Sequence, residues 1–337
     1  MNYSMNTSAM PESPSMGGVW KALPPIIPPV DVELLKSELN DETFLRYTNR
    51  GDNELYVVNN ENAPHVLREI GRLREVSFRA VGGGSGTECD LDHFDLEDKA
   101  CFQLIVWNPE ADEIIGGYRF TRWKMASFHE NGQPYVNTEH LFDFSQKFID
   151  NEFPHCIEMA RAFVQPKYQS AAGGRKALFA LDNLWDGIGG LVATDPTVKY
   201  LSGKVTIYKT SPEMSRKAMV YYLDMSFGDR EGLITSKNPE TCTPEQAAFF
   251  KEMFTGADYK ENYTILNNYV KSLGDTIPPF IHLYIGLSPT MKTFGTTFDP
   301  DFGDCYDTAM IITAADIYPD KYKRYVESYE KCKVKPA

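Results

Sequence analysis

The sequence predicts an α/β (α+β) protein built on one twisted, mixed β-sheet with helices on both faces. Strand-like and helical runs alternate along most of the 337 residues. Two strand-like runs, 102–108 and 113–123, are separated only by the turn PEAD. Further along, a strand-like run, a turn and a helical run follow one another within 155–192. This mixed order is typical of a sheet that packs helices on both sides.

The individual elements follow from residue type and periodicity. Short runs rich in β-branched and aromatic residues predict strands at 54–60, 102–108, 113–123, 155–164, 199–208, 280–287 and 307–317. Apolar residues at helical spacing predict helices at 63–81, 177–192, 212–227, near 244–254 and near 260–273. The region 138–151 is interpreted as a short helix or loop, and 165–176 as a turn.

The domain organisation is predicted to be simple. Residues 1–18 are rich in Ser, Met, Asn and Gly and are expected to be disordered. Residues 19–45 begin with the apolar, Pro-rich run VWKALPPIIPPV and are expected to form a strap across the surface. A single domain is expected over 46–330, with a helical insertion at 229–275 in the C-terminal third.

Composition limits the classes of function. A hydrophobic content of 42% indicates a globular protein, and the net charge of −13 argues against a nucleic-acid partner. No apolar run approaches the roughly 20 residues of a membrane span. We therefore expect a cytoplasmic protein. The six cysteines have neither zinc nor CxxC spacing and are expected to be free thiols.

The strand HCIEMARAFV (155–164) carries two charged residues in an apolar setting. Glu158 and Arg161 are three residues apart and would point to opposite faces of a regular strand. A β-bulge between them would bring both side chains to one face. Because buried charges are costly unless they are paired or functional, the pair indicates either a site in the middle of the sheet or a structural ion pair.

A glycine-rich loop precedes a group of acids in GGGSGTECDLDHFD (82–95). It lacks the Lys-Ser or Lys-Thr pair of a phosphate loop, and its acids would repel a polyphosphate. The glycines are expected to form a lid or entry loop, and an ordinary mobile surface loop is the alternative. Upstream, Arg74 shares a helix face with Phe78, which would place it at the rim of the buried stripe.

These features resemble the acyl-homoserine-lactone synthase branch of the GNAT acyltransferase superfamily. In that branch an Arg and a Phe on the first helix precede an acidic run, an Arg that follows a Gly on a strand, and an E-x-x-R strand. The matching residues here are Arg74, Phe78, Asp90, Asp92, Asp95, Arg119, Glu158 and Arg161. The loop lacks the tryptophan of those synthases and has Asp90 in place of Glu. An autoinducer-type synthase is therefore the alternative rather than the first hypothesis.

A second resemblance covers residues 25–327. The runs LWDGIGGLV, YLSGKVTIYKTSPEMSRKAMVYYL and PPFIHLYIGLSPTMKTFGTTFDPDFGDCYDTAMII are similar to bacterial N-acyltransferases that make ornithine and glycine lipids, once described as hemolysins. The region from IIPPVDVELLK to GGYRF is similar to the Bacteroidetes glycine lipid synthases. A non-catalytic or membrane-active hemolysin is a further alternative.

This resemblance implies a GNAT-like fold and a reaction. A fatty acyl group, commonly 3-hydroxylated, would pass from acyl carrier protein to the α-amine of a small amino acid. Glycine is favoured and ornithine is next. No cofactor would stay bound, because the 4'-phosphopantetheine thioester of acyl carrier protein is a co-substrate. The hydrophobic product implies that the enzyme acts near the inner membrane face, and that a downstream O-acyltransferase uses this product.

The resemblance also implies roles for individual residues. Glu158 is expected to act as general base, directly or through water, and Arg161, Asp92 and Asp95 to complete the catalytic group. Asp92 and Asp95 would hold the three arginines in an alternating-charge network around the amino acid. Substrate binding is assigned to Arg74, Phe78, Arg119 and the bulged segment Ala162, Phe163 and Val164, whose backbone N–H groups would stabilise the oxyanion. A purely structural Asp/Arg cluster is the alternative.

The donor site is predicted from QSAAGGRKAL (169–178). It is one residue longer than the pattern of coenzyme A-binding relatives, which favours a carrier-protein donor. The residues assigned to the pantetheine arm and the carrier protein are Lys167, Gly173, Gly174, Arg175 and Lys176. Ordinary solvated side chains are the alternative. No metal site is expected, because the histidines show no ligand spacing.

Overall fold

An eight-stranded mixed sheet forms the centre of the computed structural model, which describes residues 23–169 and 174–334. The strand order is β1-β2-β3-β4-β6-β7-β10-β9, and β6 and β7 form its parallel pair. The strands of this sheet are β1 (Phe44–Tyr47), β2 (Glu54–Val58), β3 (Cys101–Asn108), β4 (Glu113–Arg122), β6 (Cys156–Val164), β7 (Tyr200–Ile207), β9 (Lys292–Asp299) and β10 (Cys305–Thr313). A separate two-stranded sheet pairs β5 (Phe142–Phe144) with β8 (Ile234–Ser236). The predicted mixed sheet is confirmed.

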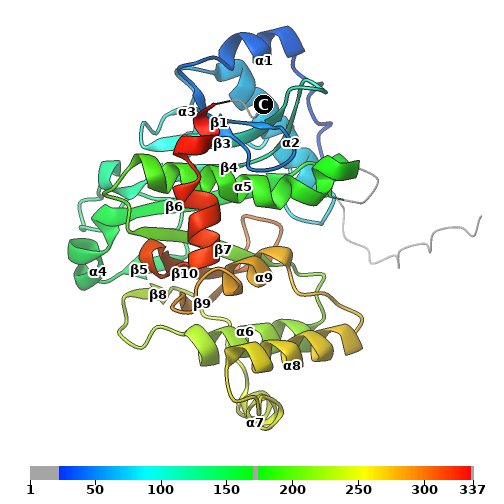
Figure 1. Cartoon of the computed structure of the whole chain (residues 1–337). Helices are drawn as coiled ribbons and strands as arrows, with labels where there is room; N and C mark the ends of the chain where they lie inside the picture. Colours follow the sequence, from blue (N-terminus) through cyan, green and yellow to red (C-terminus); the bar gives the residue numbers. More distant parts are fainter. Residues whose placement is uncertain (1–22, 170–173, 335–337) are drawn as a thin grey trace, which may run out of the picture.

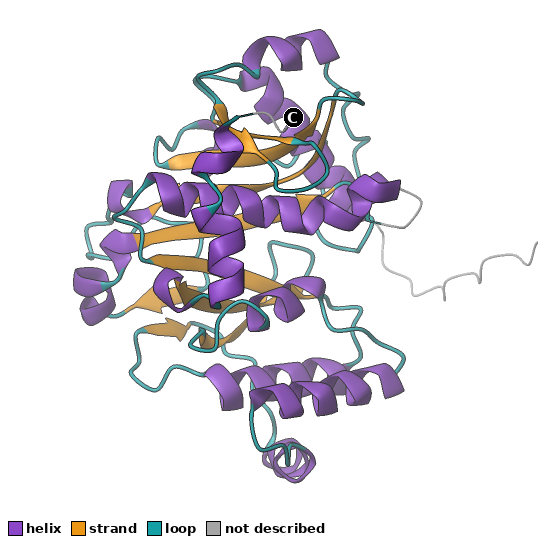
Figure 2. Ribbon diagram, in the orientation of Figure 1, coloured by secondary structure: helices purple, strands orange, loops and turns teal. Residues whose placement is uncertain are grey.

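Helices cover both faces of the sheet (Figures 1 and 2). The α-helices are α1 (Val32–Glu38), α2 (Pro64–Arg79), α3 (His93–Leu96), α4 (Gln146–Asn151), α5 (Gly174–Thr194), α6 (Glu213–Phe227), α7 (Pro244–Met253), α8 (Tyr259–Ser272), α9 (Pro279–Ile285) and α10 (Pro319–Tyr322). Alternating side chains of β3 show the two layers. Leu104 and Val106 belong to the core that contains α5, whereas Ile105 and Trp107 belong to the core that contains α2.

Helix α2 forms where the sequence predicts it, because Pro64 occupies its first turn and its apolar residues recur at helical spacing. Val66, Ile70 and Leu73 are buried against the sheet. Arg74 is also fully buried. Its guanidinium therefore needs partners inside the protein, which are described below.

The extended segment before α1 runs along α2. Val30 donates its backbone N–H to the Glu69 carboxylate at 3.0 Å, and Ile27 donates its N–H to the Glu88 carbonyl at 3.1 Å. The segment 1–18, expected to be disordered, lies outside the described residues. All six cysteines are described and are free. No helix among the described residues has both the length and the apolar character that crossing a bilayer requires.

Helices α6, α7 and α8 form a further layer beside the sheet (Figure 1). Phe254 stacks on Tyr221 of α6, and the hydroxyl of Tyr222 donates a hydrogen bond of 2.8 Å to the Tyr259 carbonyl. The aromatic contacts join the region 229–275 to the main core rather than leaving it separate. The predicted helices near 244–254 and 260–273 are confirmed.

The sequence prediction is wrong for 280–287, which is helix α9 and not a strand. Its buried residues Ile281, Tyr284 and Ile285 have helical spacing, and Pro279 lies in its first turn. Strand β9 was not predicted. Its buried residues include the polar Thr293, Thr296 and Thr297, and each hydroxyl is hydrogen-bonded inside the protein.

Candidate active site

The predicted bulge is present in β6 and lies at Arg161. Gly117 of β4 pairs with Phe163, and Arg119 pairs with Ala160. Between these pairs β6 contains one more residue than β4, which defines the bulge. Arg161 has φ of 49°, a left-handed conformation that a non-glycine residue adopts at a cost. The extra residue brings the Arg161 side chain to the face of the sheet that carries Arg119.

Two buried arginines, the half-buried Arg161 and three aspartates alternate on this face. Arg74 contacts Asp95 at 3.0 Å, and Arg119 contacts both Asp95 at 3.2 Å and Asp92 at 2.7 Å. Arg161 completes the row through Asp90 at 2.7 Å and Asp92 at 3.4 Å. The network foreseen from the sequence is therefore present, and Asp90 belongs to it.

Backbone hydrogen bonds also hold two of these acids. Asp92 caps the N-terminus of α3 by accepting from the Asp95 N–H, and Asp95 accepts in return from the Asp92 N–H, both at 3.2 Å. Burial would raise the pKa of Asp95, but the charges of Arg74 and Arg119 outweigh it and hold that pKa far below the ordinary range. In the same way Arg119 lowers the pKa of Asp92 against the effect of burial. Both carboxylates are ionised at neutral pH.

Glu158 lies on the same face but has different partners. Its side chain is 1% exposed, and Trp123 donates its indole N–H to one carboxylate oxygen at 3.0 Å. The Thr138 hydroxyl donates to the other oxygen. Both oxygens therefore have hydrogen-bond donors within the protein.

A cavity of about 460 Å³ opens where β6 and β7 separate. The two strands are paired from Cys156 with Tyr200 up to Met159 with Gly203. Beyond that point, Ala160–Val164 and Lys204–Thr206 line the cavity instead of pairing with each other. The bulged segment of β6 is therefore not paired with β7 beside the cavity.

The cavity wall is polar on the α2 side of the sheet. Lys204 forms an ion pair with Asp307 at 3.2 Å, and the Thr206 hydroxyl donates to the same carboxylate at 2.7 Å. His140 and Asp299 lie 3.5 Å apart and also line the cavity. Burial works to raise the pKa of Asp299, but the hydrogen bond from His140 and the charge of Lys204 lower it on balance.

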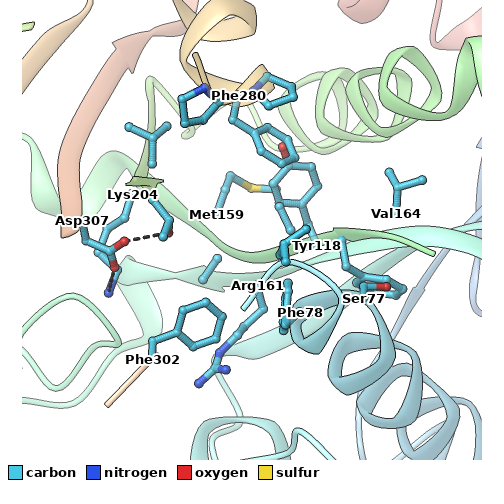
Figure 3. Close-up of a pocket in the computed structure, with 18 of the residues that line it drawn as sticks. Ser77, Phe78, Tyr118, Met159, Arg161, Val164, Lys204, Phe280, Phe302 and Asp307 are labelled. Carbon is cyan, nitrogen blue, oxygen red and sulfur yellow. Dashed lines mark hydrogen bonds and ion pairs between the residues drawn. The ribbon is translucent and has the colours of Figure 1, made fainter. Parts of the chain in front are cut away.

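The wall is apolar on the α5 side. Figure 3 shows Met159, Tyr118 and Phe280 around one part of the cavity, with the Arg161 guanidinium pointing away from them beside Phe302. The Arg161 guanidinium carbon lies 4.9 Å from the centre of the Phe302 ring. Burial raises the pKa of Tyr284, which lines the same part of the cavity, to about 12, so that its phenol is neutral. The cavity therefore offers an apolar compartment and a charged compartment on either side of the divided strands.

Comparison with known proteins identifies the chemistry. Residues 73–177 match the acetyltransferase (GNAT) domain family. A glycine N(alpha)-acyltransferase of Phocaeicola vulgatus is 44% identical over 306 residues, which cover 91% of this chain and 94% of that protein. A glycine N(alpha)-acyltransferase of Bacteroides thetaiotaomicron is 45% identical over 307 residues, or 90% of each chain. The chain belongs to this acyltransferase family.

Solved structures with weaker similarity carry related names. FeeM, an N-acyl amino acid synthase from uncultured soil microbes, is 10% identical with a TM-score of 0.38, covering 82% of this chain and 97% of its own. The acyl-homoserine lactone synthase BjaI is 10% identical with a TM-score of 0.34, covering 82% of this chain and 90% of its own.

The predicted site residues of this acyltransferase divide into two groups. Phe78, Arg161 and the segment Ala162–Val164 line the cavity. The remaining predicted residues do not line the cavity; they are Arg74, Asp92, Asp95, Arg119 and Glu158. All of them except the half-buried Asp92 are buried. The roles assigned to them stay predictions, and those that require direct contact with substrate are not supported by this placement.

Other cavity residues were missed by the sequence analysis. His140, Lys204, Asp299 and Asp307 come from a loop and three strands, and His140 and Asp299 are 159 positions apart. No local spacing could have grouped them. The only local signal is the acidic run DPDFGDCYD (299–307), whose composition predicts a turn rich in Asx caps.

The predicted donor residues lie only partly within the described chain. Gly174 begins α5, and Ala177, Ala180 and Leu181 of this helix line the cavity. Lys167 is exposed and contacts Glu113 at 2.6 Å. Gly173 and the side chains of Arg175 and Lys176 lie outside the described residues.

Proposed function

We propose that this acyltransferase transfers a long acyl chain from a thioester to the α-amine of glycine, and that the reaction occurs between β6 and β7. The observation that carries the proposal is the cavity that joins an apolar to a charged compartment at the bulge. An acyl chain suits the side of Phe280 and Met159, and an amino acid suits the side of Arg161 and Lys204. The glycine preference rests on the names of the two relatives.

The reaction forms one bond and breaks another. The neutral amine nitrogen attacks the thioester carbonyl carbon, a new C–N bond forms, and the C–S bond breaks. One amine proton goes to a base, and the leaving thiolate takes up a proton. In this proposal, N–H groups of the segment Ala162–Val164, which lines the cavity and is not paired with β7, stabilise the negative oxygen of the tetrahedral intermediate.

Recognition of a small zwitterion requires both signs of charge. Arg161 and Lys204 are cations at the polar wall and suit the substrate carboxylate. Asp299 and Asp307 suit the ammonium group. The buried acid-arginine network holds Arg161 from behind through Asp90 and Asp92.

The donor proposed is acyl carrier protein, with the thioester on its 4'-phosphopantetheine arm. The arm would enter beside the N-terminus of α5, where helix N–H groups favour a phosphate. Ornithine is the next acceptor to test. The N-acyl product is amphiphilic, which suits a peripheral location at the inner membrane face and a downstream O-acyltransferase.

One reaction tests reaction type, donor and acceptor together. Purified protein is incubated with 3-hydroxypalmitoyl carrier protein and an equimolar pool of amino acids, in parallel with the coenzyme A thioester, and products are identified by mass spectrometry. We expect N-acylglycine from the carrier-protein thioester. An absence of amide from both donors would contradict the proposed function, and a different amino acid in the product would correct the acceptor.

A further inference from the structure

We propose that His140 is the general base that takes the proton from the acceptor amine, and that Arg119 and Glu158 are positioning residues that act through the segment 137–140. The proposal rests on the proposed function and deepens it. It assigns a role to a histidine that no motif identifies, and it gives the buried charges a function that does not require contact with substrate.

The hydrogen bonds of His140 determine its tautomer. Its Nδ1 lies 2.6 Å from the carbonyl oxygen of Asn137. A carbonyl can only accept, so Nδ1 carries the proton and the neutral ring has its lone pair on Nε2. The side chain is 40% exposed, lines the cavity, and has its Nε2 3.5 Å from Asp299. The charged ring would donate from Nε2 to Asp299, and the neutral ring presents its lone pair from the same nitrogen, beside the carboxylate proposed to hold the substrate ammonium.

Asp299 is suited to hold the product of this proton transfer. Its side chain is 4% exposed, and protonated Nε2 would donate to it directly. A carboxylate beside an imidazolium stabilises the charge that forms as the amine loses its proton. The proton can then leave on the thiolate sulfur when the C–S bond breaks, which restores neutral His140.

The segment that carries His140 is held by the sequence-predicted residues. Arg119 donates from its second guanidinium nitrogen to the Asn137 side chain, and Thr138 donates to Glu158. Asn137 in turn supplies the carbonyl that orients His140. Arg119 and Glu158 thus contact the segment that orients His140, although neither of them lines the cavity.

Other charged groups face the same space as His140. From β6 and β7 these are Arg161 and Lys204, and from the β9–β10 side they are Asp299, Asp301 and Asp307. Lys237 donates to the Glu139 carbonyl on the outer side of the segment. The pH profile must therefore be compared between variants that keep all of these groups.

The test uses His140→Asn, because an asparagine amide can keep the bond to the Asn137 carbonyl while removing Nε2. The matched control is His155→Asn, since His155 also has Nδ1 near a backbone carbonyl, that of Thr197 at 3.0 Å, but does not line the cavity. The measurement is kcat/KM for glycine with saturating acyl donor between pH 5.5 and 9, together with the melting temperature.

We expect His140→Asn to lower kcat/KM by about 10²–10⁴-fold and to lose the rising limb in the range where histidines titrate. The KM for the acyl donor and the melting temperature should stay near wild type, and His155→Asn should behave as wild type. The inference is overturned if His140→Asn keeps a wild-type pH profile with kcat/KM within threefold. An inactive wild-type protein would instead contradict the proposed function, so the two failures are distinguishable.

Discussion

Thr138, two residues before His140 of the cavity wall, donates a hydrogen bond from its hydroxyl to Glu158. The second oxygen of Glu158 accepts from Trp123 at 3.0 Å. A carboxylate with both oxygens engaged in this way fixes the loop to the sheet. Its buried position therefore has a structural cause that does not depend on proton transfer from the substrate.

Glu158→Gln separates positioning from base catalysis. Glutamine has nearly the same shape, can accept from Trp123, and can donate to the Thr138 oxygen, but it cannot take a proton. If Glu158 positions the loop, kcat/KM should fall far less than the roughly 10²–10⁴-fold expected for loss of a general base. Steady-state kinetics with glycine measures this directly.

Glu158→Ala is the companion variant. It leaves the Trp123 N–H and the Thr138 hydroxyl without their partner, at about 1–3 kcal/mol for each unsatisfied buried group. We expect a lower melting temperature and lower activity together. If the Glu158→Gln protein were inactive with an unchanged melting temperature, Glu158 would be the general base and the positioning role would be refuted.

Replacing Arg161 tests the bulge itself. At φ of 49° any residue with a Cβ is disfavoured by about 1–2 kcal/mol, whereas glycine is not. Arg161→Gly should therefore be more stable than Arg161→Ala by roughly that amount, although both lose the contacts to Asp90 and Asp92. Urea unfolding of the two variants measures the difference, and equal stabilities would contradict the strained conformation.

Much of the fold could be predicted from local sequence, because strands such as 102–108 and helices such as 63–81 have clear apolar patterns. Strand β9 could not, since its inward residues are threonines whose burial depends on partners such as Thr308, Asn238 and Leu223. The site divides in the same way. Glu158 and Arg161 share one short motif, whereas His140 and Asp299 are far apart in the sequence and are brought together by the place of β9 at the edge of the sheet.

Asp95→Asn should make the stability of the protein less dependent on pH in the acid range. The pKa of Asp95 is lowered by folding, so its contribution is present above the unfolded pKa of about 3.9 and is lost as pH falls through the lower folded pKa. At pH 7 the variant should lose about 3–5 kcal/mol, because Arg74 and Arg119 lose a buried partner. The gap between wild type and variant should narrow as pH decreases from 5 towards 2.

Denaturant unfolding at several pH values checks this prediction. Asp143 provides a control, because it is an exposed aspartate on β5 whose contact is to Lys237 at 3.5 Å. Asp143→Asn should change the unfolding free energy by less than about 1 kcal/mol at any pH. A constant gap for Asp95→Asn between pH 5 and 2 would contradict the assigned direction of its pKa.

Ala177→Leu should shorten the preferred acyl chain. Ala177 lines the cavity near the start of α5, on the side of Leu181 and Phe280, and a larger side chain would occupy apolar space. We expect kcat/KM to fall for 3-hydroxypalmitoyl donors and to fall less for chains several carbons shorter. Ala248→Leu on the exposed face of α7 is the matched control. An unchanged chain-length profile for Ala177→Leu would place the acyl chain elsewhere.

Lys167 offers a test of the carrier-protein donor. It is exposed, lies just before the N-terminus of α5, and makes one ion pair with Glu113, so that an acidic partner could compete for its charge. Lys167→Glu should raise KM for the carrier-protein thioester by about three- to tenfold, more at low salt than at high salt, because exposed charges are screened. The coenzyme A thioester, which lacks the protein surface, should respond much less.

Lys147→Glu is the matched control for this experiment. Lys147 is similarly exposed and is likewise paired with a glutamate, Glu231, but it belongs to α4 and not to the segment before α5. The two lysines therefore differ mainly in position, because only Lys167 lies in the segment that leads into α5. If both reversals raised KM for the carrier protein equally, the effect would reflect net charge rather than docking beside α5, and the entry proposed for the pantetheine arm would be wrong.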